Sequence, residues 1–222
     1  MHLAGIRPWK SLNWPNRISL LRLLLVAPYV ILLMNQNDPG WGWARYAALG
    51  IFIVMALSDA LDGYLARRFQ ARTRLGAILD PMADKAMIIC SVVLLSLPAG
   101  AVQGAALAGW VVVLIVAKDL WLILGFLVVY LVTDRFRVRP TVAGKVCTVV
   151  QCLMVGLTLL APDLNAAAGG LGTWAARAAS WAAAAACAVA AFSYTLLGLA
   201  FIARAGEKPL EEHAPNQNHG QH

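Results

Sequence analysis

The segment DALDGYLARRFQARTRLGAILDPMADK, from Asp59 to Lys85, places four aspartates and four arginines between two long apolar runs. The aspartates form two pairs. Asp59 and Asp62 are three residues apart, and Asp80 and Asp84 are four apart. Both spacings put the two partners on one face of an α-helix. The segment therefore predicts two helices joined by a short basic loop, each helix with a pair of carboxylates on one face.

The sequence on both sides of this segment is strongly apolar. The chain has 222 residues, of which 60% are hydrophobic and only 13% are charged, about half of the ~25% charged residues usual in a soluble domain. Windows of ~20 apolar residues, the length that crosses a bilayer core, occur six times, near residues 17–35, 46–66, 77–98, 105–132, 140–162 and 175–203. We predict an all-α fold, an integral membrane bundle of six transmembrane helices.

Three regions are expected along the chain. We expect residues 1–16 to form a short N-terminal interfacial segment with two tryptophans. Residues 17–205 are expected to form the six-helix membrane catalytic domain, and residues 206–222 a disordered polar cytoplasmic tail. The four cysteines lie in apolar windows without the spacing of metal ligands, and the four histidines lie near the termini. A thiol or histidine site is therefore not expected.

Basic residues indicate how the chain sits in the membrane. If the six helices alternate in direction, the termini and the loops near residues 70 and 136 share one face, and this face holds 14 of the 18 basic residues. The positive-inside rule makes that face cytoplasmic. We expect a multi-pass protein, in a bacterial cytoplasmic membrane, with both termini in the cytoplasm. The net charge of +7 favours contact with anionic membrane lipids, and no nucleic-acid partner is expected, because aromatic residues do not alternate with the basic clusters.

Four aspartates close together in a membrane helix pair need positive charge. Each costs ~2.5–3.5 kcal/mol near a helix centre, so four would cost on the order of 10 kcal/mol if they were deep. A cluster of carboxylates without histidine or thiol is the ligand set that Mg²⁺ or Mn²⁺ prefers. The alternative is that Asp59 and Asp62 pair with Arg67 and Arg68 as a solvated helix end, but Asp80 and Asp84 have only Lys85 at helical spacing.

The spacing D-x2-D-G-x2-A-R-x8-G-x3-D-x3-D resembles the signature of the CDP-alcohol phosphatidyltransferases. Every position of that signature is present, filled by Asp59, Asp62, Gly63, Ala66, Arg67, Gly76, Asp80 and Asp84. Members of the family are typically six-helix membrane enzymes, often dimers, so the resemblance implies a homodimer. It also implies two divalent cations, Mg²⁺ or Mn²⁺, as cofactors.

The resemblance implies a role for each position. Asp59 and Asp80 would bridge the two cations, Asp62 would complete the first metal site, and Asp84 would touch the second cation or act as general base. The CDP part of the lipid substrate would be bound by Gly63, Arg67 and Thr73, with Gly76 at the start of the helix. The stretch PNRISLLRLLLVAP also resembles the N-terminal pattern of the family and would place Asn16 and Arg22 near the nucleotide.

The reaction that this family implies is phosphatidyl transfer from CDP-diacylglycerol. An acceptor hydroxyl attacks the phosphorus next to diacylglycerol and CMP leaves, with two cations stabilising the in-line displacement and Asp84 accepting the proton. Lys118, near the middle of the fourth apolar window, reads either as a structural pair with Asp119 or as an acceptor contact. Arg139 and Lys145 flank PTVAG, where they could bind an anionic phosphate or serve only as positive-inside charge.

Glycerol 3-phosphate is favoured as the acceptor, with phosphatidylglycerol as the alternative and inositol phosphate or another alcohol as a further one. The first half of the chain and the segment GKVCT, residues 144–148, are similar to phosphatidylglycerophosphate synthases, whose acceptor is glycerol 3-phosphate. Those enzymes usually carry an Arg-Glu pair and a second arginine on the fourth helix, where this chain has AKDLWLILGFLVVY. The stretch VRPTVAGKVCTVVQ is similar to eukaryotic-type cardiolipin synthases, which use phosphatidylglycerol.

Two other classes of protein use acidic residues in membrane helices. Intramembrane prenyltransferases hold a lipid pyrophosphate with aspartates and Mg²⁺, but their motifs have other spacings and the chains are longer. Cation or proton transporters usually place buried carboxylates at the bilayer midplane between repeated halves, whereas here the carboxylates lie towards one end and no repeat is visible. Both classes are therefore weaker hypotheses than the transferase.

Overall fold

The computed structural model describes residues 14–69, 76–133 and 141–206, with side chains for residues 20–58, 85–125 and 141–200. In these residues all regular structure is α-helical, which agrees with the predicted fold class. The six helices lie close to the six predicted apolar windows: α1 Trp14–Asn35, α2 Ala44–Phe69, α3 Gly76–Ser96, α4 Gly109–Thr133, α5 Val142–Ala167 and α6 Leu171–Gly206.

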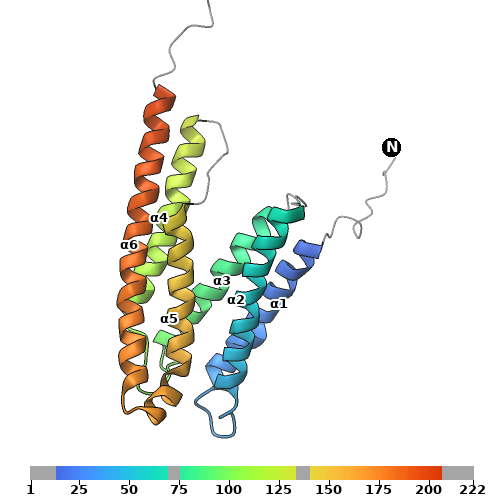
Figure 1. Ribbon diagram of the computed structural model, residues 1–222, viewed down its shortest axis with the longest axis vertical. Coiled ribbons are helices and arrows are strands. Elements are labelled where there is room, and N and C mark those ends of the chain that lie inside the picture. Colours follow the sequence, from blue (N-terminus) through green and yellow to red (C-terminus); the bar gives the residue numbers. More distant parts are fainter. Residues whose placement is uncertain (1–13, 70–75, 134–140, 207–222) are drawn as a thin grey trace, which may run out of the picture.

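The helices form two groups of three (Figure 1). In the first group α1 packs against both α2 and α3, and in the second α6 packs against both α4 and α5. Contacts of α3 with α4 and α5, and of α2 with α5, join the two groups. The first group thus carries both acidic segments of the sequence, and the second supplies the surfaces that pack against α3.

Close packing of α5 and α6 depends on small side chains. The residues Ala176, Ala183, Cys187 and Ala190 of α6 are all buried, at the three-, four- and seven-residue spacings of a single helix face. Small residues let two helices approach closely. At Gly172 the two helices leave no room for a side chain, because a Cβ atom there would overlap the carbonyl group of Ala161 in α5.

Polar contacts hold the helices together at the end of the molecule that carries the α1–α2 and α5–α6 loops (Figure 1). The guanidinium of Arg45 in α2 donates to both carboxylate oxygens of Asp163 in α5, at 2.7 and 3.1 Å, and to the carbonyl of Leu159 at 2.7 Å. Tyr46 Oη donates to the same carboxylate at 2.7 Å. This bidentate ion pair fixes α2 against α5 at the end of the molecule that carries the α1–α2 and α5–α6 loops.

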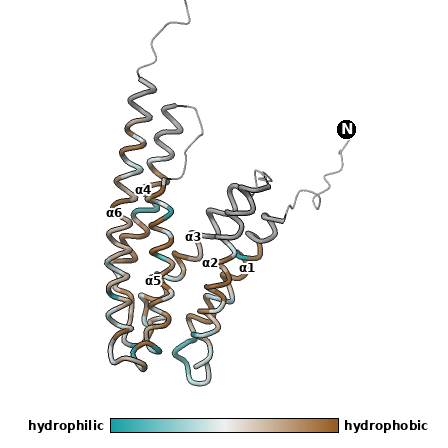
Figure 2. Tube along the Cα trace, in the orientation of Figure 1, coloured by the Kyte–Doolittle hydropathy of each residue, from teal (hydrophilic) through white to brown (hydrophobic). Residues whose placement is uncertain are grey.

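Two of the described helical segments are long and apolar enough to cross a membrane, Val142–Ala167 and Leu171–Ala200. Shorter apolar segments are Leu20–Asn35, Ala44–Ser58 and Lys85–Ser96. Figure 2 shows apolar residues along the described parts of the helices and a concentration of hydrophilic residues in the α1–α2 loop. The all-helical architecture is therefore established, whereas a bundle of six membrane spans remains an expectation.

Candidate active site

The four aspartates of the acidic segments belong to α2 and α3, two helices of the first group that follow one another in the chain. Asp59 and Asp62 lie in the C-terminal part of α2, and Asp80 and Asp84 lie in the N-terminal part of α3. Because both segments are helical, the three- and four-residue spacings place the partners of each pair on one helix face. Their side chains lie outside those that the structure describes, so their mutual distances stay a prediction.

The other nucleotide-binding candidates fall into two groups. Gly63, Arg67 and Gly76 lie in the same stretches of α2 and α3, and Asn16 lies in the first turn of α1, all outside the described side chains. The nucleotide-binding candidate Thr73 lies outside the described residues altogether, as does the acceptor candidate Arg139.

Arg22 of α1 is described, and it is buried, with 2% of its surface exposed. Burial of a guanidinium costs several kcal/mol unless the charge is paired or hydrogen-bonded. Arg22 therefore lies inside the first helix group, on the helix that packs against both α2 and α3. Its role near the nucleotide stays a prediction.

A cluster of three charged side chains connects α3 to α4 next to the acidic segment. Asp119 Oδ1 accepts from Lys85 Nζ at 2.6 Å and from Lys118 Nζ at 2.7 Å. The side chains of Asp119 and Lys118 are almost completely buried, with 8% and 5% exposed, whereas 40% of the Lys85 side chain is exposed. The geometry thus includes the structural pair of Lys118 with Asp119 that the sequence suggested, and adds Lys85 as a third member.

The pairing of Lys85 was not anticipated from the sequence. Lys85 directly follows Asp84, so sequence spacing offered the acidic residues of its own helix as partners, whereas the structure pairs it with a carboxylate 34 positions later. An unexplained aspartate in the middle of an apolar window was the available signal, because a buried carboxylate requires a cation. The contact fixes α3 against α4 one residue beyond Asp84.

Lys145 is the described candidate for the acceptor site on α5. It lies exposed in the first turn of that helix. The turn begins with an N-cap at Thr141, whose Oγ1 accepts from the Gly144 amide at 3.1 Å. Tyr194 of α6 lies directly over this turn, because a Cβ atom at Gly144 would be 2.5 Å from its hydroxyl. A larger side chain at position 144 would therefore displace the Tyr194 ring where the PTVAG segment meets α6. Lys145, the next residue, is exposed.

The described side chains contain no group of three or more histidine, cysteine, aspartate or glutamate residues that could hold a metal ion. The predicted two-cation site therefore rests on the four aspartates. Their placement on two helices that both pack against α1 is compatible with a shared all-oxygen site, the donor type that Mg²⁺ and Mn²⁺ prefer.

Replacement of the shared carboxylate in the α3–α4 cluster tests its importance. We expect Asp119→Asn to lower the free energy of unfolding by about 1–3 kcal/mol, because two lysines then lose a charged hydrogen-bond acceptor in a mostly buried place. Thermal unfolding of the purified protein in detergent measures the effect. Asp38→Asn, which alters an exposed loop carboxylate, is the matched control, and equal stability of the two variants would contradict the prediction.

Comparison with known proteins gives one family and a consistent set of relatives. The family model for CDP-alcohol phosphatidyltransferase matches residues 12–194. A CDP-diacylglycerol–glycerol-3-phosphate 3-phosphatidyltransferase of Cereibacter sphaeroides is 39% identical over 87 residues, 38% of each chain. A probable phosphatidylglycerophosphate synthase of Mycobacterium tuberculosis is 35% identical over 149 residues, 67% of this chain and 66% of the relative. A cardiolipin synthase (CMP-forming) of Oryza sativa is 42% identical over 88 residues, 40% of this chain and 26% of the relative.

The family match covers much more of the chain than the match to the Cereibacter sphaeroides relative. The match to the Cereibacter sphaeroides relative spans about two fifths of that protein's length, whereas the family match runs from just before α1 into α6 and includes both acidic segments. Every position of the eight-residue signature falls inside the matched region. The chain therefore belongs to the CDP-alcohol phosphatidyltransferase family.

Proposed function

We propose that this protein transfers the phosphatidyl group from CDP-diacylglycerol to glycerol 3-phosphate and releases CMP. The observation that carries the proposal is the complete signature of the family, with its two aspartate pairs on α2 and α3, inside a family match of residues 12–194. Membership of the phosphatidyltransferase family supports the CDP-linked donor, and the names of the relatives support the acceptor.

The four aspartates would hold two divalent cations, Mg²⁺ or Mn²⁺, with Asp59 and Asp80 contributing to both sites. When bound, such cations offset the charge of the pyrophosphate and stabilise the leaving phosphate. Asp84 accepts the proton of the acceptor hydroxyl as it attacks. Gly63, Arg67, Thr73 and Gly76 bind the CDP moiety, and Asn16 and Arg22 of α1 lie near the nucleotide.

The protein would act within a membrane. All six helices serve as spans in this proposal, since the described parts of α1, α2 and α3 also contain apolar segments, and both termini face the cytoplasm because most basic residues lie on that side. CDP-diacylglycerol and the other membrane lipids then reach the acidic segments from the cytoplasmic leaflet. A homodimer in a bacterial cytoplasmic membrane is part of the same proposal.

Glycerol 3-phosphate is favoured as acceptor by the names of the relatives, since those of Cereibacter sphaeroides, Bacillus subtilis and Escherichia coli are all CDP-diacylglycerol–glycerol-3-phosphate 3-phosphatidyltransferases. A small phosphorylated acceptor also needs cationic side chains that bind its phosphate. Lys145 is exposed and Lys85 is half-exposed, and with Arg139 they would supply them. Lys118 would act on the acceptor site only indirectly, through Asp119, because its ammonium group is buried against that carboxylate.

Phosphatidylglycerol is the second candidate acceptor, which would make the protein a cardiolipin synthase. It is favoured by the similarity to the Oryza sativa cardiolipin synthase and by the character of α4, where a buried Lys118–Asp119 pair stands in place of the Arg-Glu pair expected for glycerol 3-phosphate. The exposed apolar residues of α4 next to this pair, such as Leu120 and Ile123, suit a lipid acceptor.

An acceptor assay tests the proposal. Purified protein in mixed micelles is given CDP-diacylglycerol, Mg²⁺ or Mn²⁺, and one acceptor at a time, and the lipid product and CMP are measured together. We expect CMP release with glycerol 3-phosphate and a phosphorylated lipid product. Product with phosphatidylglycerol alone would establish the second candidate. Failure to release CMP with any alcohol, combined with movement of Mn²⁺ or protons into liposomes, would instead establish a transporter.

A further inference from the structure

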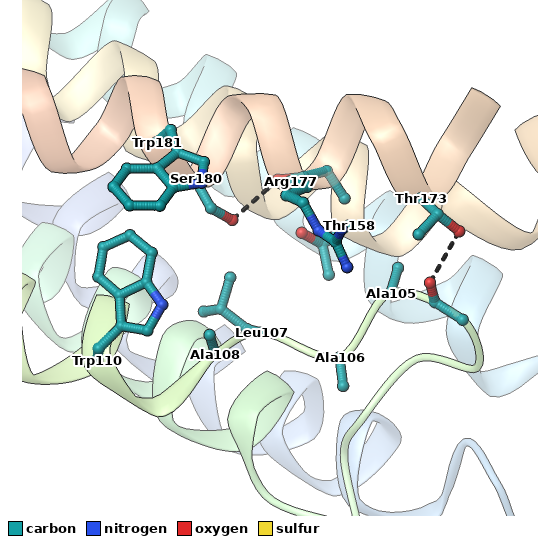
Figure 3. A pocket seen from close by; sticks show the side chains of 12 residues that line it. Ala105, Ala106, Leu107, Ala108, Trp110, Thr158, Thr173, Arg177, Ser180 and Trp181 are labelled. Atoms are coloured by element: carbon teal, nitrogen blue, oxygen red, sulfur yellow. Dashed lines mark hydrogen bonds between the residues drawn. The ribbon is translucent and has the colours of Figure 1, made fainter. Parts of the chain in front are cut away.

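A cavity of about 320 Å³ lies at the loop end of the second helix group. Its walls come from the α3–α4 loop at Ala105–Ala108, from Thr158 of α5 and from the first turns of α6. Figure 3 shows the Arg177 side chain reaching from α6 into the space between Thr158 and the loop. The cavity is remote from the proposed reaction, because the helical path along α3 from Asp84 to the start of this loop is roughly 20 Å long.

Arg177 is the cation of this cavity, and it has no carboxylate partner among the described residues. Its recorded contact is a cation–π interaction, with the guanidinium 5.7 Å from the centre of the Trp174 ring. Arg45, at the same end of the molecule, by contrast forms a bidentate ion pair with Asp163. Arg177 is exposed, near the start of α6, and lines the cavity wall. Arg177 is therefore available to bind an anion in this cavity.

The other polar groups of the cavity wall leave Arg177 as the main hydrogen-bond donor. Thr158, Thr173 and Ser180 each donate their hydroxyl proton to a backbone carbonyl, at 2.8 Å in every case. A guanidinium offers several N–H groups in a planar fork that matches phosphate oxygens. The positive end of the α4 dipole, which begins at Gly109 at the edge of the cavity, adds to the same preference.

The surroundings of the cavity favour a lipid over a soluble anion. Its volume suits a small head group. The ring centres of Trp110 and Trp181 lie 4.8 Å apart at its side (Figure 3). Both residues are exposed, as is Val113 one turn along α4. Tryptophans at such positions are typical of the membrane–water interface, and the apolar surface of α4 beyond them can hold acyl chains.

We propose that this cavity binds the phosphate of an anionic phospholipid through Arg177, with the acyl chains along α4 and α6. The lipid belongs to the leaflet opposite to the acidic segments, so it stabilises the second helix group without taking part in the reaction. The site depends on the membrane location of the protein and not on the identity of its substrates.

Lipid retention measured by native mass spectrometry tests the site. The protein is released from micelles that contain either phosphatidylglycerol or phosphatidylcholine, and bound lipids are counted. We expect Arg177→Gln to weaken phosphatidylglycerol binding roughly tenfold, the loss of one good charged hydrogen bond, and Arg177→Lys to weaken it less. Phosphatidylcholine retention, weak from the start, should not change. Binding at the acidic segments is common to all variants and cancels in the comparison.

A second pair of variants separates a filled cavity from a lost charge. Ala106→Trp places an indole in the wall of the cavity and keeps Arg177, whereas Ala178→Trp places the same group on an exposed position of α6 outside the wall. We expect only Ala106→Trp to lower phosphatidylglycerol retention, and both variants to keep the same CMP release. Equal retention by wild type and Arg177→Gln, no effect of Ala106→Trp, or displacement of the lipid by excess glycerol phosphate would each overturn the proposal.

Discussion

Asp84→Asn is expected to reduce CMP release from CDP-diacylglycerol by about 10²–10⁴-fold, the usual contribution of a general base. Asparagine has nearly the same size as aspartate and keeps the helix of α3 intact, but its amide cannot accept the proton of the attacking hydroxyl. Binding of CDP-diacylglycerol should be largely retained, because the three other aspartates and the CDP-binding residues are unchanged. Initial rates and binding of a labelled CDP-lipid measure the two effects separately.

The matched control for this variant is Asp38→Asn, which removes an equal charge from the exposed α1–α2 loop at the opposite end of the helices. Its rate should equal that of the wild type. The assignment of Asp84 as general base is wrong if Asp84→Asn retains a rate close to that of the control. A parallel loss of substrate binding would instead make Asp84 mainly a metal ligand.

Asp59→Asn is expected to weaken Mn²⁺ binding by at least 10–100-fold and to abolish turnover with it. The proposed bridging carboxylate contributes to both cations, so its loss removes a negative charge and an oxygen ligand from each. Mutation of residues that only support a metal ligand typically lowers metal affinity about 10–100-fold, so loss of a ligand should cost at least as much. Titration of the purified protein with Mn²⁺, followed by electron paramagnetic resonance without any lipid substrate, measures the affinity directly. Equal Mn²⁺ binding by wild type and Asp59→Asn would remove the basis for the two-cation site.

The same titration distinguishes a metal site from the solvated ion-pair alternative. If Asp59 and Asp62 only paired with Arg67 and Arg68, Arg67→Gln would destabilise the end of α2 and leave Mn²⁺ binding absent in every variant. In the metal-site interpretation, Arg67→Gln keeps Mn²⁺ affinity and weakens binding of the CDP-lipid, because Arg67 contacts the nucleotide and not the cations.

The helices and the acidic motif followed from the sequence because both are local properties. Apolar windows of about 20 residues predicted all six helices to within a few residues, since the length and hydropathy of a window decide whether it is helical in a membrane. The signature between Asp59 and Asp84 predicted the family for a similar reason. Its spacing places residues on one helix face, whatever the rest of the chain does. Gly144 is an intermediate case, since its motif was visible but its contact with Tyr194 was not.

Contacts between distant helices could be decided only by the tertiary structure. Lys85 and Asp119 are 34 residues apart and share one hydrogen bond, and Arg45 reaches Asp163 across 118 residues. Nothing in the sequence indicated that Arg177 lines a cavity. Packing of the α3–α4 loop against α5 and α6 places it there. Periodicity fixes which face a residue occupies on its own helix, whereas the partner on that face depends on how the helices pack, which is a property of the whole chain.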